Sequence, residues 1–240
     1  MDAGKRLGWS VREVQGALGR LSRDKWLAHP RRGLYVYLDP FTKEQRAHPF
    51  VVGTRAASPS AVSHWSALQH WGLTEQLPDH VSISTSKDLR RPPENAAYGR
   101  TLWRLLDTSY EFIQVRPQRL FGIDQVRVGR WEVPIFDKER AILDTFLQPA
   151  YFGSISVGLE VVESRLAEID LRKLVRYALK LGVGHTIKRL GWALDRAGVP
   201  SKTTEPLLKA PLSASTRVLL EPSGKRRGSL DPKWRVLMNQ

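Results

Sequence analysis

The sequence has no cysteine among its 240 residues. This absence excludes disulfide bonds, thiol catalysis and zinc sites with cysteine ligands, and it fits a reducing compartment. No apolar run approaches the roughly 20 residues that a membrane-spanning helix needs. Residues 1–6 also hold no apolar segment of the kind found in secretory signals. We therefore expect a soluble, cytoplasmic protein without a membrane partner.

Acidic residues are scarce, because 24 Asp and Glu stand against 38 Lys and Arg, for a formal net charge of +14. Hydrophobic residues make up 41% of the chain, which is enough for a core. Residues 1–48 carry ten basic and five acidic residues, and residues 199–240 carry eight and three. The positive charge is therefore densest at the two ends, and it predicts a polyanionic partner such as nucleic acid.

Signatures of catalysis and of nucleotide binding are missing as well. The sequence has no phosphate-binding glycine loop, no G-x-S-x-G motif and no pair of histidines at metal-ligand spacing. Asp137, Glu139 and Asp144 are the only acidic group near a strand end that could suggest metal-dependent phosphoryl chemistry. We favour a structural interpretation, in which they are a helix N-cap, a first-turn carboxylate and a surface acid. We expect no metal, no cofactor and no enzymatic activity.

A helix is predicted over residues 10–24. Ser10 and Glu13 have the S-x-x-E spacing of a capping box. Apolar residues recur at helical spacing at Val11, Val14, Leu18 and Leu21, and they form one stripe. The opposite face presents Arg12, Gln15, Gly16, Gly19, Arg20 and Arg23. The two glycines are either tolerated on a surface or let the backbone approach a phosphate closely.

A β-hairpin is predicted directly after this helix, over residues 26–38. Pro30 and Gly33 favour a turn, and Arg31 and Arg32 lie at its tip. A helix with an arginine face followed by a basic-tipped hairpin is typical of the second half of a winged helix-turn-helix, in which the helix enters the major groove. Arginine can read guanine there, and Gln15 can read adenine. A solvated basic face on a small αβ unit is the alternative.

Residues 1–9 are too few for the helices that precede the recognition helix in a full winged helix-turn-helix. We therefore expect a partial DNA-binding domain over residues 1–48, or a chain that begins at an internal Met of a longer reading frame. Part of the apolar stripe then lacks its covering layer.

The rest of the chain, residues 49–240, is predicted to be a larger mixed α/β domain, which makes the whole protein α/β (α+β type). A polar, Pro-punctuated connector is expected over residues 39–58 and a helix from Ser58 to Gly72. Residues 80–85, 110–116 and 126–136 indicate strands, the last as a hairpin. The predicted later elements are a helix capped by Asp137, helices over about 155–168, 171–181 and 185–197, and short strands over 217–220 and 234–237.

A basic run at Lys225, Arg226 and Arg227 gives three candidate additional nucleic-acid contacts. A solvated loop tip explains the same run equally well. The tryptophans are expected mostly in the core, although such side chains also stack on bases.

Several segments resemble the AbiEi family of bacterial type IV toxin–antitoxin antitoxins. They are 26–38 (WLAHPRRGLYVYL), 63–78 (SHWSALQHWGLTEQLP), 133–146 (VPIFDKERAILDTF), 170–178 (DLRKLVRYA) and 228–239 (GSLDPKWRVLMN). None is a catalytic signature, and the resemblance lies in their order along nearly the whole chain.

The resemblance implies a transcriptional autorepressor that binds inverted repeats in the promoter of its own operon. It also implies an antitoxin that counters a nucleotidyltransferase-like toxin without forming a stable complex. By position, the recognition helix and wing of the family fall on Arg12, Gln15, Arg20, Arg23, Arg31 and Arg32. Two alternatives stay open, a phosphotransferase-like enzyme that modifies the toxin and an RNA-binding module that shields the toxin's substrate.

Overall fold

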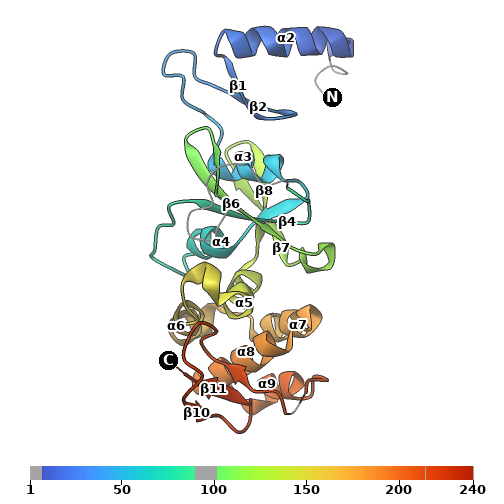
Figure 1. Ribbon diagram of the computed structural model, residues 1–240. Coiled ribbons are helices and arrows are strands. Elements are labelled where there is room, and N and C mark those ends of the chain that lie inside the picture. The colour runs from blue at the N-terminus through green and yellow to red at the C-terminus, as the bar shows by residue number, and fades with distance from the viewer. Residues whose placement is uncertain (1–6, 90–101, 214, 240) are drawn as a thin grey trace.

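The computed structural model describes residues 7–89, 102–213 and 215–239. Three parts follow one another along the molecule (Figure 1). A helix with a two-stranded hairpin lies at one end, a six-stranded sheet with its helices in the middle, and further helices with a three-stranded sheet at the other end. The predicted mixed α/β class, with an N-terminal helical unit before a larger mixed domain, is confirmed.

The N-terminal unit forms as its local signals predict. Helix α2 (Val11–Arg23) begins after Ser10, whose hydroxyl accepts from the backbone N–H of Glu13 at 3.3 Å. Glu13 Oε2 accepts from the backbone N–H of Ser10 at 2.7 Å, which completes the capping box. Strands β1 (Leu27–Arg31) and β2 (Leu34–Tyr37) then pair antiparallel. The predicted helix and hairpin are both confirmed.

The connector is shorter than predicted. Within residues 39–48, Asp39 pairs with Arg46 and accepts from the backbone N–H of Phe41 at 2.8 Å. Residues 49–56, however, form helix α3 (Pro49–Ala56), and most of them are buried. The expectation of a loop was wrong because proline at the first helical position favours a helix start as readily as a turn. The domain boundary at residue 48 stays a prediction.

The predicted helix start at Ser58 is also wrong. Residues 60–62 form strand β3 (Ser60–Val62), which pairs antiparallel with β4 (Val81–Thr85). Helix α4 (His64–His70) begins only after Ser63. All three residues of β3 are buried in the sheet, so tertiary pairing overrides the local likeness of Ser-Pro-Ser to a helix N-terminus.

The central sheet is completed by four more strands. These are β5 (Leu102–Leu105), β6 (Thr108–Gln114), β7 (Ile123–Val128) and β8 (Trp131–Phe136). The strand order is β5-β6-β4-β3-β8-β7. The β3–β8 and β4–β6 pairs are parallel, and the other pairs are antiparallel. The predicted strands of this sheet are confirmed, whereas β3 and β5 were not predicted.

The C-terminal half is mainly helical. Its helices are α5 (Lys138–Leu147), α6 (Ser156–Arg165), α7 (Leu171–Leu181), α8 (Gly184–Arg196) and α9 (Ser201–Leu208). Its short strands are β9 (Val218–Leu219), β10 (Ser229–Leu230) and β11 (Val236–Met238). The predicted caps Asp137 and Asp170 are confirmed, because each accepts from the backbone N–H three residues later. Helix α9 and strand β10 were not predicted.

Helix α3 packs very closely on the sheet. A Cβ at Gly53 would lie 2.7 Å from Cε1 of Tyr110, so only glycine allows this approach. The Tyr110 hydroxyl donates to the carbonyl of Pro49 at 3.0 Å. These contacts hold α3 on the sheet, and α3 lies between the sheet and the N-terminal hairpin (Figure 1).

Candidate nucleic-acid interface

The face of α2 that carries the arginines is open to solvent. Arg12, Gln15, Arg20 and Arg23 are all exposed, and they lie on one side of the helix by their spacing. Within the part of the chain that the structure describes, none of the three guanidinium groups has a carboxylate in ion-pair contact. The helix therefore presents unneutralised positive charge that is available to a polyanion.

The opposite, apolar face of α2 is only partly covered. Val14 and Leu18 are half-buried, whereas Val11 is 66% and Leu21 41% exposed. No residue of α2 is buried. Among the described residues, the Val11 and Leu21 positions of the stripe are thus largely uncovered, while the partial nature of the domain stays a prediction.

The glycines of α2 have open space around them. A Cβ added at Gly16 or Gly19 would meet no atom within 4 Å. Packing within the chain therefore does not require glycine at either position, and both interpretations of the pair stay open.

The two wing arginines have different surroundings. Arg32 is exposed at the hairpin turn, next to Gly33, whose φ is +82°. Arg31 is half-buried, donates from Nη1 to the carbonyl of Ala56 at 2.9 Å, and lies 5.5 Å from the ring centroid of Trp103. Arg31 thus attaches the hairpin to the central domain, and its guanidinium is already occupied within the chain.

The structure places further arginines near this attachment point that the sequence analysis did not single out. The guanidinium carbons of Arg55 and Arg130 lie 5.8 and 5.2 Å from the ring centroid of Trp131. Arg55 was missed because its segment was interpreted as a connector. The Arg130-Trp131 pair next to a glycine turn was visible in the sequence, but its proximity to Arg55 follows only from the packing of α3.

The basic run at Lys225, Arg226 and Arg227 is exposed, in the segment that connects β9 and β10. This segment lies at the end of the molecule opposite to α2 (Figure 1). The structure therefore does not bring the run together with the arginines of the helix and wing. Whether it contacts nucleic acid stays a prediction.

The acidic group on α5 has structural partners. Asp137 Oδ2 accepts from the Tyr177 hydroxyl at 2.8 Å and lies 3.1 Å from Lys173 Nζ. Glu139 Oε2 lies 2.9 Å from the same amine. Burial lowers the pKa of Lys173, but the hydrogen bonds and charges of Glu139 and Asp137 together outweigh it, so the pKa is raised. The first two interpretations of this group, an N-cap and a first-turn carboxylate, agree with these positions.

Asp144 is not the surface acid that was expected. It is 1% exposed and forms a buried ion pair with Arg140, one helical turn earlier. The error arose because the periodicity of α5 alone does not reveal that helices and strands surround it on all sides. Nine of its ten residues are buried.

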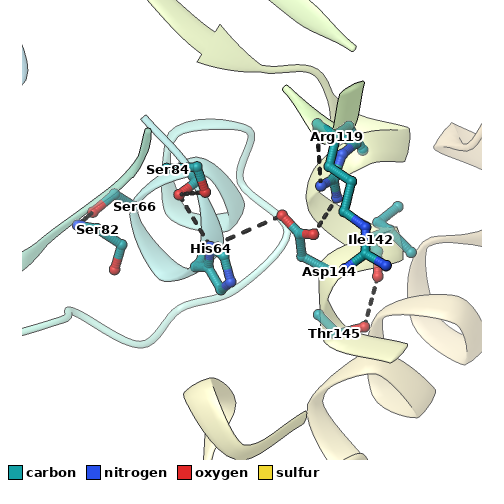
Figure 2. Close-up of polar contacts among 10 residues, drawn as sticks. His64, Ser66, Ser82, Ser84, Arg119, Ile142, Asp144 and Thr145 are labelled. Carbon is teal, nitrogen blue, oxygen red and sulfur yellow. Dashed lines mark hydrogen bonds and ion pairs between the residues drawn. The ribbon is translucent and has the colours of Figure 1, made fainter. Parts of the chain in front are cut away.

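A buried polar cluster adjoins this ion pair (Figure 2). His64 Nδ1 lies 3.0 Å from the hydroxyl of Ser63 and 3.9 Å from Asp144 Oδ2. The Ser84 hydroxyl donates to that of Ser63 at 2.9 Å. Burial lowers the pKa of His64, so the imidazole is neutral at pH 7. With His64 and Asp144 each 1% exposed, the cluster joins α4 to α5 inside the core.

Over residues 7–89, 102–213 and 215–239, no group of three or more His, Asp or Glu side chains is placed to hold a metal ion. In the same ranges no helix is both long and apolar enough to cross a membrane.

Comparisons with known proteins give a likeness of fold. No family model matches this chain, and no curated protein matches it. The crystal structure of the RV2827C protein from Mycobacterium tuberculosis is similar, with a TM-score of 0.61 and 16% sequence identity. The match covers 93% of this chain and 78% of that one. At this identity the likeness establishes a shared fold.

Proposed function

We propose that this protein is a duplex-DNA-binding transcriptional regulator that represses its own operon. In this proposal α2 is the recognition helix and the β1–β2 hairpin is the wing. Arg12, Arg20, Arg23 and Arg32 contact phosphates or guanine edges, and Gln15 contacts a base. Arg31 positions the wing on the central domain instead of contacting DNA.

One observation carries the proposal, the arginine face of α2. Three exposed arginines and a glutamine share one side of a capped helix, with no described carboxylate neutralising them. A purely structural helix would bury one face, and α2 buries none of its residues. Charge of this kind supplies most of the affinity of a protein for the phosphate backbone.

The experiment is binding to a fluorescent duplex that covers the region directly upstream of the protein's own reading frame. We expect tighter binding than to a scrambled duplex of equal length. Reversal of two charges by Arg20→Glu and Arg32→Glu should weaken binding about tenfold or more, because two attractive phosphate contacts become repulsive. The matched control is Lys202→Glu with Arg217→Glu, which changes the charge equally on exposed residues near the C-terminus.

The control variant should bind as the wild type does. Equal losses in both variants would mean that net charge alone attracts the duplex, and would remove α2 from the account. Tighter binding to RNA than to the upstream duplex would favour the RNA-shielding alternative.

We further propose that the protein is the antitoxin of a type IV toxin–antitoxin system. This part is supported by the resemblance of its ordered segments to the AbiEi family. The partner toxin would be nucleotidyltransferase-like and encoded beside this gene. Co-expression should restore growth that the toxin arrests, without co-purification of the two proteins. Continued growth arrest would contradict this part while leaving DNA binding untouched.

A further inference from the structure

We propose that the duplex held by α2 also contacts a second surface, on the central domain. This surface, the arginine–tryptophan patch, consists of Arg55, Arg130 and Trp131. It extends the proposed DNA-binding function and therefore rests on it. Its ligand is the sugar–phosphate backbone of duplex DNA that continues past the wing.

The patch is assembled from two elements that are distant in the sequence. Arg55 lies in the last turn of α3, while Arg130 and Trp131 lie at the turn between β7 and β8. Gly129 at that turn has a φ of +59°, a conformation that favours glycine. All three side chains of the patch are exposed, and that of Trp131 is 40% exposed. Such an arrangement buries too little area to be explained by core packing.

Charge within the patch is unbalanced. Both guanidinium groups lie within 6 Å of one indole ring, and in the ranges that the structure describes neither forms an ion pair with a carboxylate. The nearest acid in sequence is Glu132, but successive strand residues point to opposite faces of a sheet, so it points away from the Trp131 side. Two cations beside one ring repel each other, and a bound phosphate would relieve that repulsion.

The patch adjoins the wing. Ala56, the residue after Arg55, accepts the hydrogen bond from Arg31, whose chain neighbour Arg32 is exposed. Helix α3 lies on the side of the central domain that faces the N-terminal unit (Figure 1), and it packs against β8. The patch therefore lies beside the hairpin whose turn carries Arg32.

A duplex is favoured over a single strand as the ligand. Sequence-tolerant binding of single strands uses aromatic rings that stand free for successive bases to stack on. In the patch the indole of Trp131 has a guanidinium near it from each of two chain segments, so cations flank the ring. Cations spaced along a surface suit phosphates of a backbone.

The experiment measures the salt dependence of duplex binding by the full chain. Each phosphate contact contributes about 0.9 to the slope of log K against log salt. The double variant Arg55→Gln with Arg130→Gln should make this slope shallower by about 1.8. The control Lys202→Gln with Arg217→Gln removes equal charge from the C-terminal part and should leave the slope unchanged. Both positions of the double variant are exposed, and equal melting temperatures of the two variants check that the fold is intact.

If the Arg55–Arg130 variant has the same slope as the wild type, the proposal that the patch contacts the duplex is overturned. An equal change in the control variant, or a larger loss of single-strand binding than of duplex binding, would overturn it as well. If the Arg20→Glu, Arg32→Glu variant binds duplex more weakly than the wild type does, the proposed function is retained even when the patch is rejected. If the wild type binds no duplex at all, the proposed function itself has failed.

Discussion

Helices α2 and α5 begin in the same way and have opposite surroundings. Each starts after a side-chain N-cap, Ser10 in one and Asp137 in the other, and each carries arginine. Helix α2 buries none of its residues, whereas α5 buries nine of its ten. Local capping chemistry therefore sets where a helix starts, and the surrounding structure decides what its charges do.

The arginines show what this difference means for function. Arg140 on α5 is 1% exposed, pairs with Asp144, and lies 4.5 Å from the ring centroid of Phe136. Arg20 on α2 is exposed and has no described ion pair. A buried, paired arginine is committed to the fold, and an exposed, unpaired one is available to a ligand.

The largest effect is expected from Asp144→Ala. Removal of this carboxylate leaves the guanidinium of Arg140 buried and unpaired, which costs about 3–5 kcal/mol. The free energy of unfolding, measured in urea, should fall by that amount. The control is Glu168, which forms solvent-accessible pairs with Arg165 and Lys138, and Glu168→Ala should cost about 1 kcal/mol or less. Equal losses would show that the two pairs do not differ in burial as described.

The two N-caps should differ in the same direction. Asp137→Ala removes the cap and also the partner of Tyr177 and Lys173, so we expect a loss of about 2–3 kcal/mol. Ser10→Ala removes only an exposed cap and should cost about 1 kcal/mol or less. Urea unfolding gives the first value, and the helical circular dichroism signal reports the fraying of α2. A larger loss of unfolding free energy for Ser10→Ala than for Asp137→Ala would contradict this contrast between the two helices.

The glycines of α2 give a smaller effect with the opposite sign. Gly16→Ala with Gly19→Ala should stabilise the helix by about 0.5–1 kcal/mol per site, because alanine has the higher helix propensity. Nothing within 4 Å obstructs either added Cβ. We expect duplex affinity to stay unchanged. A strong loss of affinity in the stabilised variant would instead show that the backbone of α2 approaches the DNA at these positions.

The smallest effect is a pH dependence within the central domain. His80 Nε2 lies 3.1 Å from Glu111 Oε2, and Nδ1 lies 2.6 Å from Asp79 Oδ1. These hydrogen bonds, chiefly that with Glu111, raise the pKa of His80 above its ordinary value of 6.5. A group whose pKa is higher in the folded than in the unfolded protein stabilises the fold. This stabilisation is complete below the pKa of the unfolded state, and it is lost as the pH rises through the pKa of the folded state. The variant His80→Gln should remove this contribution.

The measurement is the difference in unfolding free energy between wild type and His80→Gln at a series of pH values. This difference should shrink as the pH is raised above 6.5. Comparison with the variant cancels the opposite contribution of His64, whose pKa burial lowers. A difference that grows with pH would contradict the assignment.

Local signals in the sequence were sufficient for some elements and not for others. The capping box at Ser10, the turn at Gly33 and the caps of α5 and α7 depend on residues within four positions of each other. The strand β3 depends on partners more than twenty residues away, so a Ser-Pro-Ser sequence was mistaken for a helix start.

The candidate site divides in the same way. Spacing along the sequence placed Arg12, Arg20 and Arg23 on one helix face. Two other features depend on how α3 packs. One is the hydrogen bond from Arg31 to the Ala56 carbonyl, and the other is the proximity of Arg55 to Trp131. Periodicity does not contain that information, because it describes one element at a time.

The most direct test of the account compares the salt dependence of duplex binding in the wild type and in a variant with Arg12, Arg20, Arg23 and Arg32 all replaced by glutamine. Each of these arginines that contacts a phosphate should make the slope of log K against log salt shallower by about 0.9, up to about 3.6 when all four do. An unchanged slope in a variant that folds as the wild type does would contradict the claim that these four arginines hold the duplex.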